Sequence, residues 1–333
     1  MSLDDFIRSF APRVDQYIEN IVRSDIEILE KASKHLIKAG GKRLRPVLLG
    51  LFAKAFGADL DVAAIAGASI EILHNFTLIH DDIMDRDEYR RGVPTTHVVY
   101  GEPMAILAGD YLYAKAYRAL LTIASRVAPS KLILIIDLLN RASEIVAEGQ
   151  ALDITLVNVS GVGEKDYIEM IYRKTSSLFM ASAGIGVALG PYSEQIDIDN
   201  AINYARYAGI AFQIRDDILG VFGEPSETGK PVLNDLREGK KTILIIHTLQ
   251  RASEKDREFI ERTVGNRNAS LNDLLRTRDL IVAYGGLEKA EKMINEYLSK
   301  ALEYLDQVKE RAVDKEAVEY VRELTYRLAY RKK

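Results

Sequence analysis

The chain has 333 residues, of which 47% are hydrophobic and 28% are charged, so it can form a large apolar core beneath a polar surface. Its net charge of −4 disfavours a general nucleic-acid binder, and any anionic ligand must be bound by local basic clusters. The absence of cysteine excludes disulfides, thiolate metal sites and cysteine nucleophiles, and it fits the cytoplasm, where we expect the protein to be located.

The N-terminal sequence and the apolar runs predict neither export nor a membrane span. The opening residues, MSLDDFIRSFAPRVDQ, are acidic and interrupted by polar side chains, unlike a signal peptide. A spanning helix needs roughly 18 apolar residues, and the uninterrupted apolar runs, such as Leu132 to Ile136, are much shorter.

Apolar residues at spacings of three and four predict an all-α protein. No strand alternation or repeat is visible, and central segments such as Met180 to Leu189 are apolar nearly all round, which is typical of buried helices. We therefore predict one domain over residues 1–333, a single large helical bundle around a central cavity. The expected helices, in chain order, cover 12–39, 60–85, 104–124, 130–156, 164–189, 197–222, 240–252, 255–264, 271–283, 287–307 and 314–330.

The first acidic cluster lies at the end of the predicted helix over 60–85. Asp81 and Asp85 are four residues apart and share a helix face, and Asp82 lies within the same turn. Three carboxylates so close repel one another, and hard oxygen ligands suit Mg²⁺. A solvated helix end is the alternative, but the mostly apolar approach from Ile70 to Ile79 favours a cavity.

A second acidic pair, Asp216 and Asp217, follows the apolar segment from Tyr207 to Ile214. Magnesium usually takes one or two carboxylates and completes its shell with water and phosphate oxygens. Two such clusters on separate helices that face one cavity would therefore bind a phosphate-bearing ligand.

Basic residues lie beside glycine breaks and acidic clusters. Arginine forks onto phosphate oxygens, whereas lysine acts as a point charge. Each of these residues taken alone is typical of a solvated surface, but together they indicate one anion site with metal and another with cations alone. They are Lys42, Arg45, Arg90, Arg91, Lys174, Lys230 and Lys240.

At this point the chain resembles the trans-type isoprenyl diphosphate synthases, and most of all the archaeal geranylgeranyl diphosphate synthases. The resemblance covers nearly the whole chain. The shared motifs, in family order, are GGKRLRP at 40–46, His74 and then DDIMD at 81–85, RRG at 90–92, GQALD at 149–153, KT at 174–175, QIRDD at 213–217, and GK at 229–230 and 239–240.

The resemblance implies a prenyltransferase that joins isopentenyl diphosphate head to tail to dimethylallyl, geranyl or farnesyl diphosphate. Geranylgeranyl diphosphate is the implied product, and Mg²⁺ is the implied cofactor, with three ions per active site when substrate is bound. A homodimer is also expected, since one exposed apolar helix face suffices for pairing.

The resemblance also implies roles for individual residues. The metal ligands would be Asp81, Asp82, Asp85 and Asp216, with Asp217 in the same second motif. The allylic diphosphate would contact Arg90, Lys174 and Lys230, with Lys240 and Gln213 nearby, and the dipoles of Thr175 and Gln213 would face the carbocation. Isopentenyl diphosphate would contact Lys42, Arg45, His74 and Arg91, while Gln150 and Asp153 would support metal-bound waters.

Two positions bear on metal number and product length. Gly220 stands where many members of the family carry a third aspartate, which puts a third ligand in the second motif in doubt. Phe76 and Thr77 stand five and four residues before Asp81, and one bulky residue at the fifth position resembles geranylgeranyl-type enzymes. Core packing is the alternative role for Phe76.

Three other readings stay open. The first alternative is a synthase that makes farnesyl or longer products, which product analysis would distinguish. A terpene cyclase needs no second diphosphate site, so Lys42, Arg45 and Arg91 disfavour it. A non-catalytic helical subunit of a heteromeric synthase is disfavoured by the acidic clusters, because buried carboxylates without a metal are costly.

Overall fold

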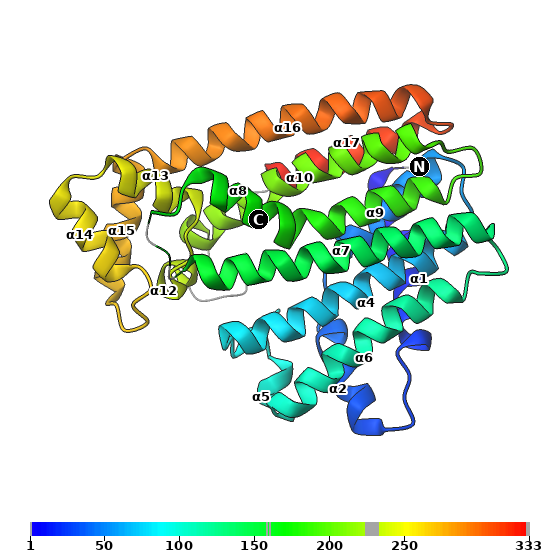
Figure 1. The fold of residues 1–333 in the computed structure, drawn as a ribbon, viewed down its shortest axis with the longest axis horizontal. Helices are drawn as coiled ribbons and strands as arrows, with labels where there is room; N and C mark the ends of the chain where they lie inside the picture. Colours follow the sequence, from blue (N-terminus) through cyan, green and yellow to red (C-terminus); the bar gives the residue numbers. More distant parts are fainter. Residues whose placement is uncertain (1, 158, 160, 224–232, 331–333) are drawn as a thin grey trace. The chain divides into compact units, whose positions relative to one another are not determined.

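The computed structural model describes residues 2–157, 159, 161–223 and 233–330 and is almost entirely helical (Figure 1). Within these residues, the strands are β1 (Tyr89–Arg90) and β2 (Val93–Pro94), which pair antiparallel. The all-α prediction is confirmed. The helices are α1 (Leu3–Ile21), α2 (Glu27–Lys38), α3 (Leu44–Ala55), α4 (Leu60–Asp85), α5 (Thr96–Tyr100), α6 (Glu102–Leu121), α7 (Pro129–Leu156), α8 (Glu164–Ile171), η1 (Tyr172–Ser176), α9 (Ser177–Ala188), α10 (Gln195–Phe222), α12 (Asn234–Glu238), α13 (Ile243–Arg251), α14 (Glu254–Thr263), α15 (Leu271–Ala283), α16 (Gly286–Arg311) and α17 (Lys315–Ala329).

The N-terminal helix begins earlier than predicted, and the expected helix over 12–39 is two helices. Ser2 caps α1: its hydroxyl accepts from the amide of Asp5, and the Asp5 carboxylate accepts from the amide of Ser2. Pro12 lies inside α1 because the buried face of Phe6, Phe10, Val14 and Ile18 continues past it. The prediction placed the start of the helix at residue 12 and missed the cap at Ser2.

Two further differences come from segments without a usable periodicity. Helix α3 was not among the predicted helices, because all its residues from Pro46 to Ala55 except Lys54 are buried and no polar face marks it. The helix expected over 164–189 is interrupted by the π-helical turn η1, which no local sequence signal announces.

The chain forms two compact units that interleave along the sequence. The first contains residues 1–144, 177–206 and 301–326, and the second contains 145–176, 207–300 and 327–333. In the first unit, α4 packs against α6, α3 and α1, and α3 packs against α9. The single domain and its central cavity stay predictions.

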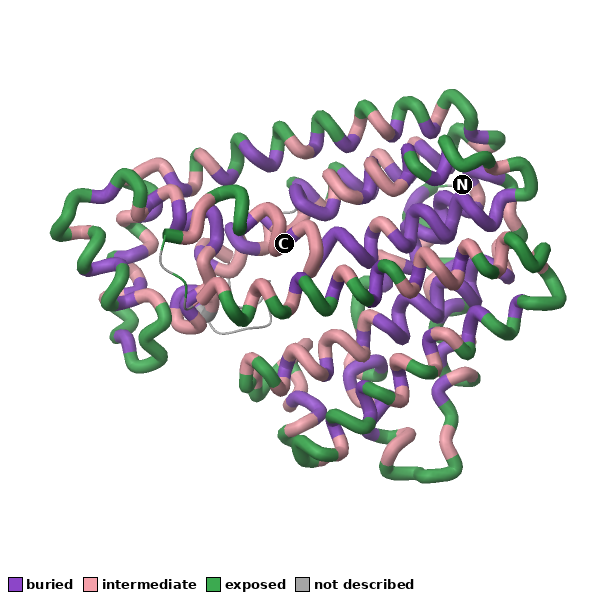
Figure 2. Tube along the Cα trace, viewed as in Figure 1, coloured by how far each residue is buried: buried purple, intermediate pink, exposed green. Residues whose placement is uncertain are grey.

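Helix α4 is the apolar centre of the first unit (Figure 2). By length and composition it could cross a membrane. The sequence analysis did not predict this because polar residues interrupt its apolar runs. Of its most apolar window, 78% is buried inside the structure, so its hydrophobicity serves the protein core. Its C-terminal end carries the first acidic cluster.

Candidate active site

The first acidic cluster surrounds an arginine at the end of α4. Asp82 is fully buried, and one of its carboxylate oxygens accepts a hydrogen bond from Nε of Arg90. Nη2 of Arg90 lies 3.6 Å from a carboxylate oxygen of Asp81 and 3.7 Å from one of Asp87. Carboxylates at the negative end of a helix dipole are unfavourable, so a cation is needed here.

The cluster fits a divalent ion only with additional ligands. Burial raises the pKa of Asp82 to about 6 even though Arg90 opposes the shift, and Oδ2 of Asp82 is buried without a hydrogen-bond partner. Asp81 and Asp85 are half-buried beside it. Among the described residues, no three carboxylate or imidazole groups are gathered well enough to bind a metal by themselves. A hard cation therefore fits together with phosphate oxygens.

The hairpin β1–β2 directs two consecutive arginines to different partners. Arg91 and Gly92, at its turn, both have positive φ, of 55° and 76°, as tight hairpin turns require. Arg90 contacts the acidic cluster, whereas Arg91 donates to the main-chain carbonyls of Leu36 and Gly40. The predicted division of Arg90 and Arg91 between two sites thus has a local geometric basis.

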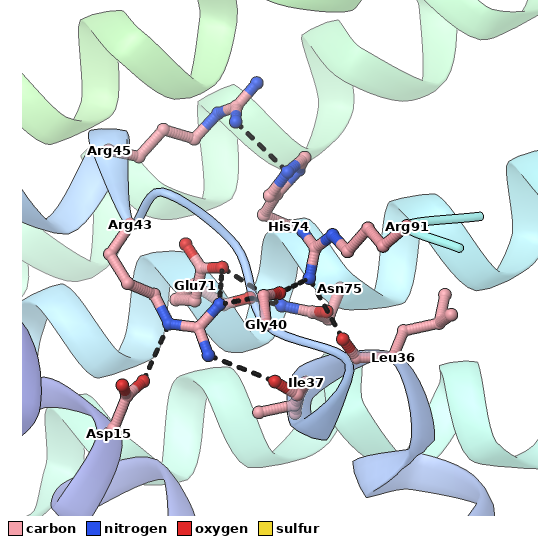
Figure 3. A network of polar contacts seen from close by, with 10 residues as sticks. All are labelled: Asp15, Leu36, Ile37, Gly40, Arg43, Arg45, Glu71, His74, Asn75 and Arg91. Carbon is pink, nitrogen blue, oxygen red and sulfur yellow. Dashed lines mark hydrogen bonds and ion pairs between the residues drawn. The ribbon is translucent and has the colours of Figure 1, made fainter. Parts of the chain in front are cut away.

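Arg45 and His74 are in contact with each other and belong to a basic group of the first unit, which consists of Arg43, Arg45, His74 and Arg91 (Figure 3). Nη1 of Arg45 lies 3.1 Å from Nε2 of His74, and its guanidinium carbon lies 4.8 Å from the ring centroid of Phe179. Burial and the charges of Arg45 and Arg91 hold the pKa of His74 well below its usual range. The neutral ring therefore accepts a hydrogen bond from Arg45 at Nε2 and carries its own proton on Nδ1.

The same basic group contains Arg43, which the sequence analysis did not single out. Lys42, which was predicted to bind substrate, is exposed, whereas the neighbouring Arg43 is buried and donates to four acceptors. Burial lowers the pKa of Arg45 to about 10, and it also lowers the pKa of Arg91. Cations whose charge burial disfavours are poised to bind an anion.

In the second unit, Asp217 is buried between neutral donors. The hydroxyl of Tyr167 donates to Oδ2 of Asp217 over 2.6 Å, and Nε2 of Gln213 donates to Oδ1 over 2.8 Å. Burial and the Asp235 carboxylate raise the pKa of Asp217 to about 7, against the effect of these hydrogen bonds. Both oxygens of Asp217 are used, while Asp216 is half-buried, so Asp216 is the better candidate ligand. Tyr167 has no sequence signal that would have predicted this contact.

Thr175 and Gln213, whose dipoles were both predicted to face the carbocation, are in direct contact. The Thr175 hydroxyl donates to Oε1 of Gln213 over 2.6 Å, so its oxygen keeps its lone pairs for another partner. Thr175 lies in η1, and a Cβ on Gly149 would lie 2.2 Å from the amide nitrogen of Lys174. A Cβ on Gly209 would lie 2.5 Å from Oγ of Ser176. The π-turn is thus fixed by two close helix approaches that only glycine permits.

The predicted lysines of the second unit have different surroundings. Nζ of Lys174 lies 2.6 Å from the Asp153 carboxylate, so Asp153 supports a substrate-binding candidate directly. Lys240 pairs with Glu238 at 3.0 Å. Lys230 lies outside the described residues.

The glycine at position 220 is explained by the Asp235 carboxylate beside it. A Cβ at this position would lie 2.0 Å from Oδ2 of Asp235, a residue of α12 that the sequence analysis did not single out. A carboxylate already occupies the space beside the second motif where many family members have their third aspartate. The absence of that aspartate thus leaves a carboxylate in the same neighbourhood.

Phe76 lies in an aromatic group between α4 and α6. Its ring centroid is 4.8 Å from that of His80 and 5.3 Å from that of Tyr113, and the rings of Phe76 and Tyr113 are only half-buried. The hydroxyl of Thr77 donates to the carbonyl of His74 within the same helix. Phe76 is therefore the more suitable of the two to limit a neighbouring space.

An all-helical fold with two aspartate-rich helix segments and cation groups defines a class of diphosphate-binding helical proteins. Residues 26–281 match the sequence profile of the polyprenyl synthetase family. The chain belongs to this family.

Named relatives and a solved structure agree with the family over nearly full length. The chain is 42% identical to a geranylgeranyl diphosphate synthase of Sulfolobus acidocaldarius, over 97% of this chain and 98% of the relative. It is 45% identical to a geranylfarnesyl diphosphate synthase of Aeropyrum pernix, over 92% and 95%. The structure of geranylgeranyl pyrophosphate synthase from Corynebacterium glutamicum, complexed with isoprenyl diphosphate and magnesium, is 29% identical over 99% of this chain and 100% of that chain, with a TM-score of 0.88.

Proposed function

We propose that this chain is a prenyltransferase that condenses isopentenyl diphosphate head to tail with allylic diphosphates to give geranylgeranyl diphosphate. The observation that carries the proposal is the pairing, within the first unit, of a carboxylate cluster with a separate cation group. Asp81 and Asp82 surround Arg90, whereas the hydrogen bonds of Arg45 and Arg91 within the described part of the chain go to His74 and to main-chain carbonyls. One diphosphate then requires a divalent ion, and the other does not.

Asp81, Asp85 and Asp216 are the proposed magnesium ligands. Bound Mg²⁺ supplies Lewis-acid stabilisation of the leaving diphosphate, worth several kcal/mol. The Corynebacterium relative, solved with magnesium and isoprenyl diphosphate, supports divalent-metal use by this chain. Arg90 and Lys174 would bind the allylic diphosphate in addition, as forked and point charges respectively.

The remaining residues would act on the hydrocarbon part of the reaction. Because the Thr175 hydroxyl donates its hydrogen bond to Gln213, its oxygen lone pairs are available to stabilise positive charge on an allylic carbon. The carbon–oxygen bond to diphosphate breaks and leaves an allylic cation. The double bond of isopentenyl diphosphate then attacks that carbon, and the new adduct loses a proton to the departed diphosphate. Water must be excluded, because it would quench the cation.

The side chain of Phe76 is proposed to limit the length of the product. Relatives of similar identity carry the names of different products, so a few side chains rather than overall similarity set the length. The Phe76 ring packs against Tyr113, so Phe76→Ala opens space between α4 and α6. We expect this variant to give products longer than those of the wild type by chromatography, and an unchanged profile would leave Phe76 a core residue only.

We also propose a homodimer in the cytoplasm. Val98 and Val99 of α5 and Ile106 and Leu107 of α6 are between 41% and 55% exposed, and together they offer an apolar face to a second copy. Light scattering would measure the mass, and a monomer at micromolar concentration would contradict the dimer.

The deciding experiment is incubation with isopentenyl diphosphate and each allylic primer, with and without Mg²⁺, followed by chain-length analysis. We expect geranylgeranyl diphosphate from every primer, and none without the metal. Farnesyl or longer products would replace the product assignment. Inactivity alone, with activity restored by a partner chain, would make this a subunit of a heteromeric synthase.

A further inference from the structure

Arg43 differs from the other cations of the basic group because carboxylates compensate its charge. Its Nε donates to Oδ1 of Asp15 over 2.7 Å, and its Nη1 donates to Oε1 of Glu71 over 3.2 Å. The side chains of Arg43 and Glu71 are 7% and 3% exposed. By contrast, neither Arg45 nor Arg91 forms an ion pair among the residues that the structure describes.

The remaining bonds of Arg43 fix the main chain before α3 (Figure 3). Nη1 donates to the carbonyl of Gly40 over 3.2 Å, and Nη2 donates to that of Ile37 over 3.1 Å. Arg43 itself has a φ of 48°, an unfavourable left-handed conformation for a side-chain-bearing residue. Such a conformation persists when its surroundings over-determine it, and four acceptors do so here.

The turn that Arg43 fixes is shared with Arg91. The Gly40 carbonyl also accepts from Nη1 of Arg91, so two guanidinium groups converge on one oxygen. A Cβ on Gly41, whose φ is 148°, would lie 2.7 Å from Nη1 of Arg43 and 3.2 Å from the guanidinium carbon of Arg91. The position of Arg91 therefore depends on the turn, and the turn depends on Arg43.

We propose that Arg43 is a positioning residue for isopentenyl diphosphate, acting through the Gly40–Gly41 turn on Arg91 without touching the ligand. This inference rests on the proposed function and deepens it. Asp15 and Glu71 pair with Arg43, so Arg43 contributes geometry, whereas Arg45 and Arg91, which form no ion pair among the described residues, supply the positive charge that a metal-free diphosphate needs.

The test is Arg43→Lys in the full-length protein. Lysine keeps the charge, but one ammonium cannot reproduce a fork that reaches two carboxylates and two carbonyls. We expect KM for isopentenyl diphosphate to rise about tenfold, as for the loss of hydrogen bonds to a charged group. KM for farnesyl diphosphate and kcat should stay within about twofold, because Arg91 is proposed to contact isopentenyl diphosphate only. A purely structural defect would instead change all three parameters together.

A matched control and a milder variant keep the test decisive. Arg126→Lys alters an arginine of the same unit that pairs with Asp59 and Asp61, and it should leave all three parameters unchanged. If Arg43→Lys fails to fold, Asp15→Ala removes one half-exposed partner and should raise the same KM about threefold. An unchanged KM for isopentenyl diphosphate in a folded variant, or an equal loss in all three parameters, overturns the inference.

Calorimetric titration with isopentenyl diphosphate in EDTA separates this inference from the proposed function. Wild-type protein that binds isopentenyl diphosphate in EDTA but does not condense it with an allylic primer when Mg²⁺ is supplied would refute the function alone, and the loss of affinity in Arg43→Lys would still test the positioning role. Wild-type protein that neither binds nor condenses would refute both.

Discussion

Asp82 and Asp217 are the same kind of residue in two comparable places, and the structure stabilises them in opposite ways. Each belongs to a pair of aspartates, each is buried, and burial raises the pKa of each, to about 6 and about 7. Asp82 is compensated by a full charge on Arg90, whereas Asp217 receives two neutral hydrogen bonds.

The difference indicates which region keeps its charge. A buried carboxylate next to a cation stays ionised at a lower pH than one next to dipoles, so the first cluster remains anionic near neutrality. Asp217 is close to its midpoint there, so this carboxylate is charged in only part of the molecules. The first cluster is thus the stronger cation site, and substitutions there should have the larger effects.

The largest expected effect is on turnover. Asp81→Ala removes a proposed metal ligand, and we expect kcat to fall by at least roughly 10³-fold, or about 4 kcal/mol. Asp137→Ala, at an exposed ion pair with Arg141, is the control and should retain wild-type turnover. Near-normal rates for Asp81→Ala at saturating Mg²⁺ would remove Asp81 from the metal site.

The next effect is on stability. Arg90→Met leaves Asp82 buried without its cation, so we expect the free energy of unfolding to fall by about 3 kcal/mol in metal-free buffer at pH 8. The loss should shrink toward pH 5, because Asp82 then takes a proton. Denaturant titrations of Arg90→Met and of the exposed control Arg141→Met would measure it. A loss independent of pH would mean that packing rather than charge is responsible.

The sequence predicts the positions of the aspartates but not the residues that compensate their charge. The positions of Asp81, Asp82, Asp216 and Asp217 followed from helical periodicity, because an apolar face and a polar end are local features. The compensating partners did not. Tyr167 is 50 residues from Asp217 along the chain, and nothing in its local pattern distinguishes it from a core tyrosine.

Backbone features were the least predictable. Both the π-turn at Thr175 and the left-handed Arg43 are imposed by contacts distant in sequence, such as those of Gly149 with Lys174 and of Glu71 with Arg43. Propensity favours an uninterrupted helix at the first and disfavours the observed φ at the second. Tertiary contacts therefore decided what local rules could not.

A pH titration of stability tests the raised pKa of Asp217. Below about pH 3, Asp217 is protonated in both the folded and unfolded states, and its pKa shift has no effect on stability. As pH rises toward 7 the unfolded state loses its proton first, so wild-type stability falls relative to Asp217→Asn. We expect a relative loss of about 2 kcal/mol between pH 5 and 7, levelling off above pH 7. Unfolding free energies in EDTA would measure it, and a constant difference would show that Asp217 titrates normally.

The smallest effect concerns the position of the missing third aspartate. Gly220→Ala places a Cβ against the Asp235 carboxylate, a side-chain end that can turn aside, so we expect a loss of only about 1 kcal/mol. In an Asp235→Ala background the same substitution should cost less, because the clash is gone. Gly220→Asp should weaken rather than strengthen Mg²⁺ binding by calorimetry, since the new carboxylate must displace an existing one. Tighter binding would mean that Asp235 does not occupy the position of the third aspartate, and the two acidic regions would then be more alike than their buried aspartates indicate.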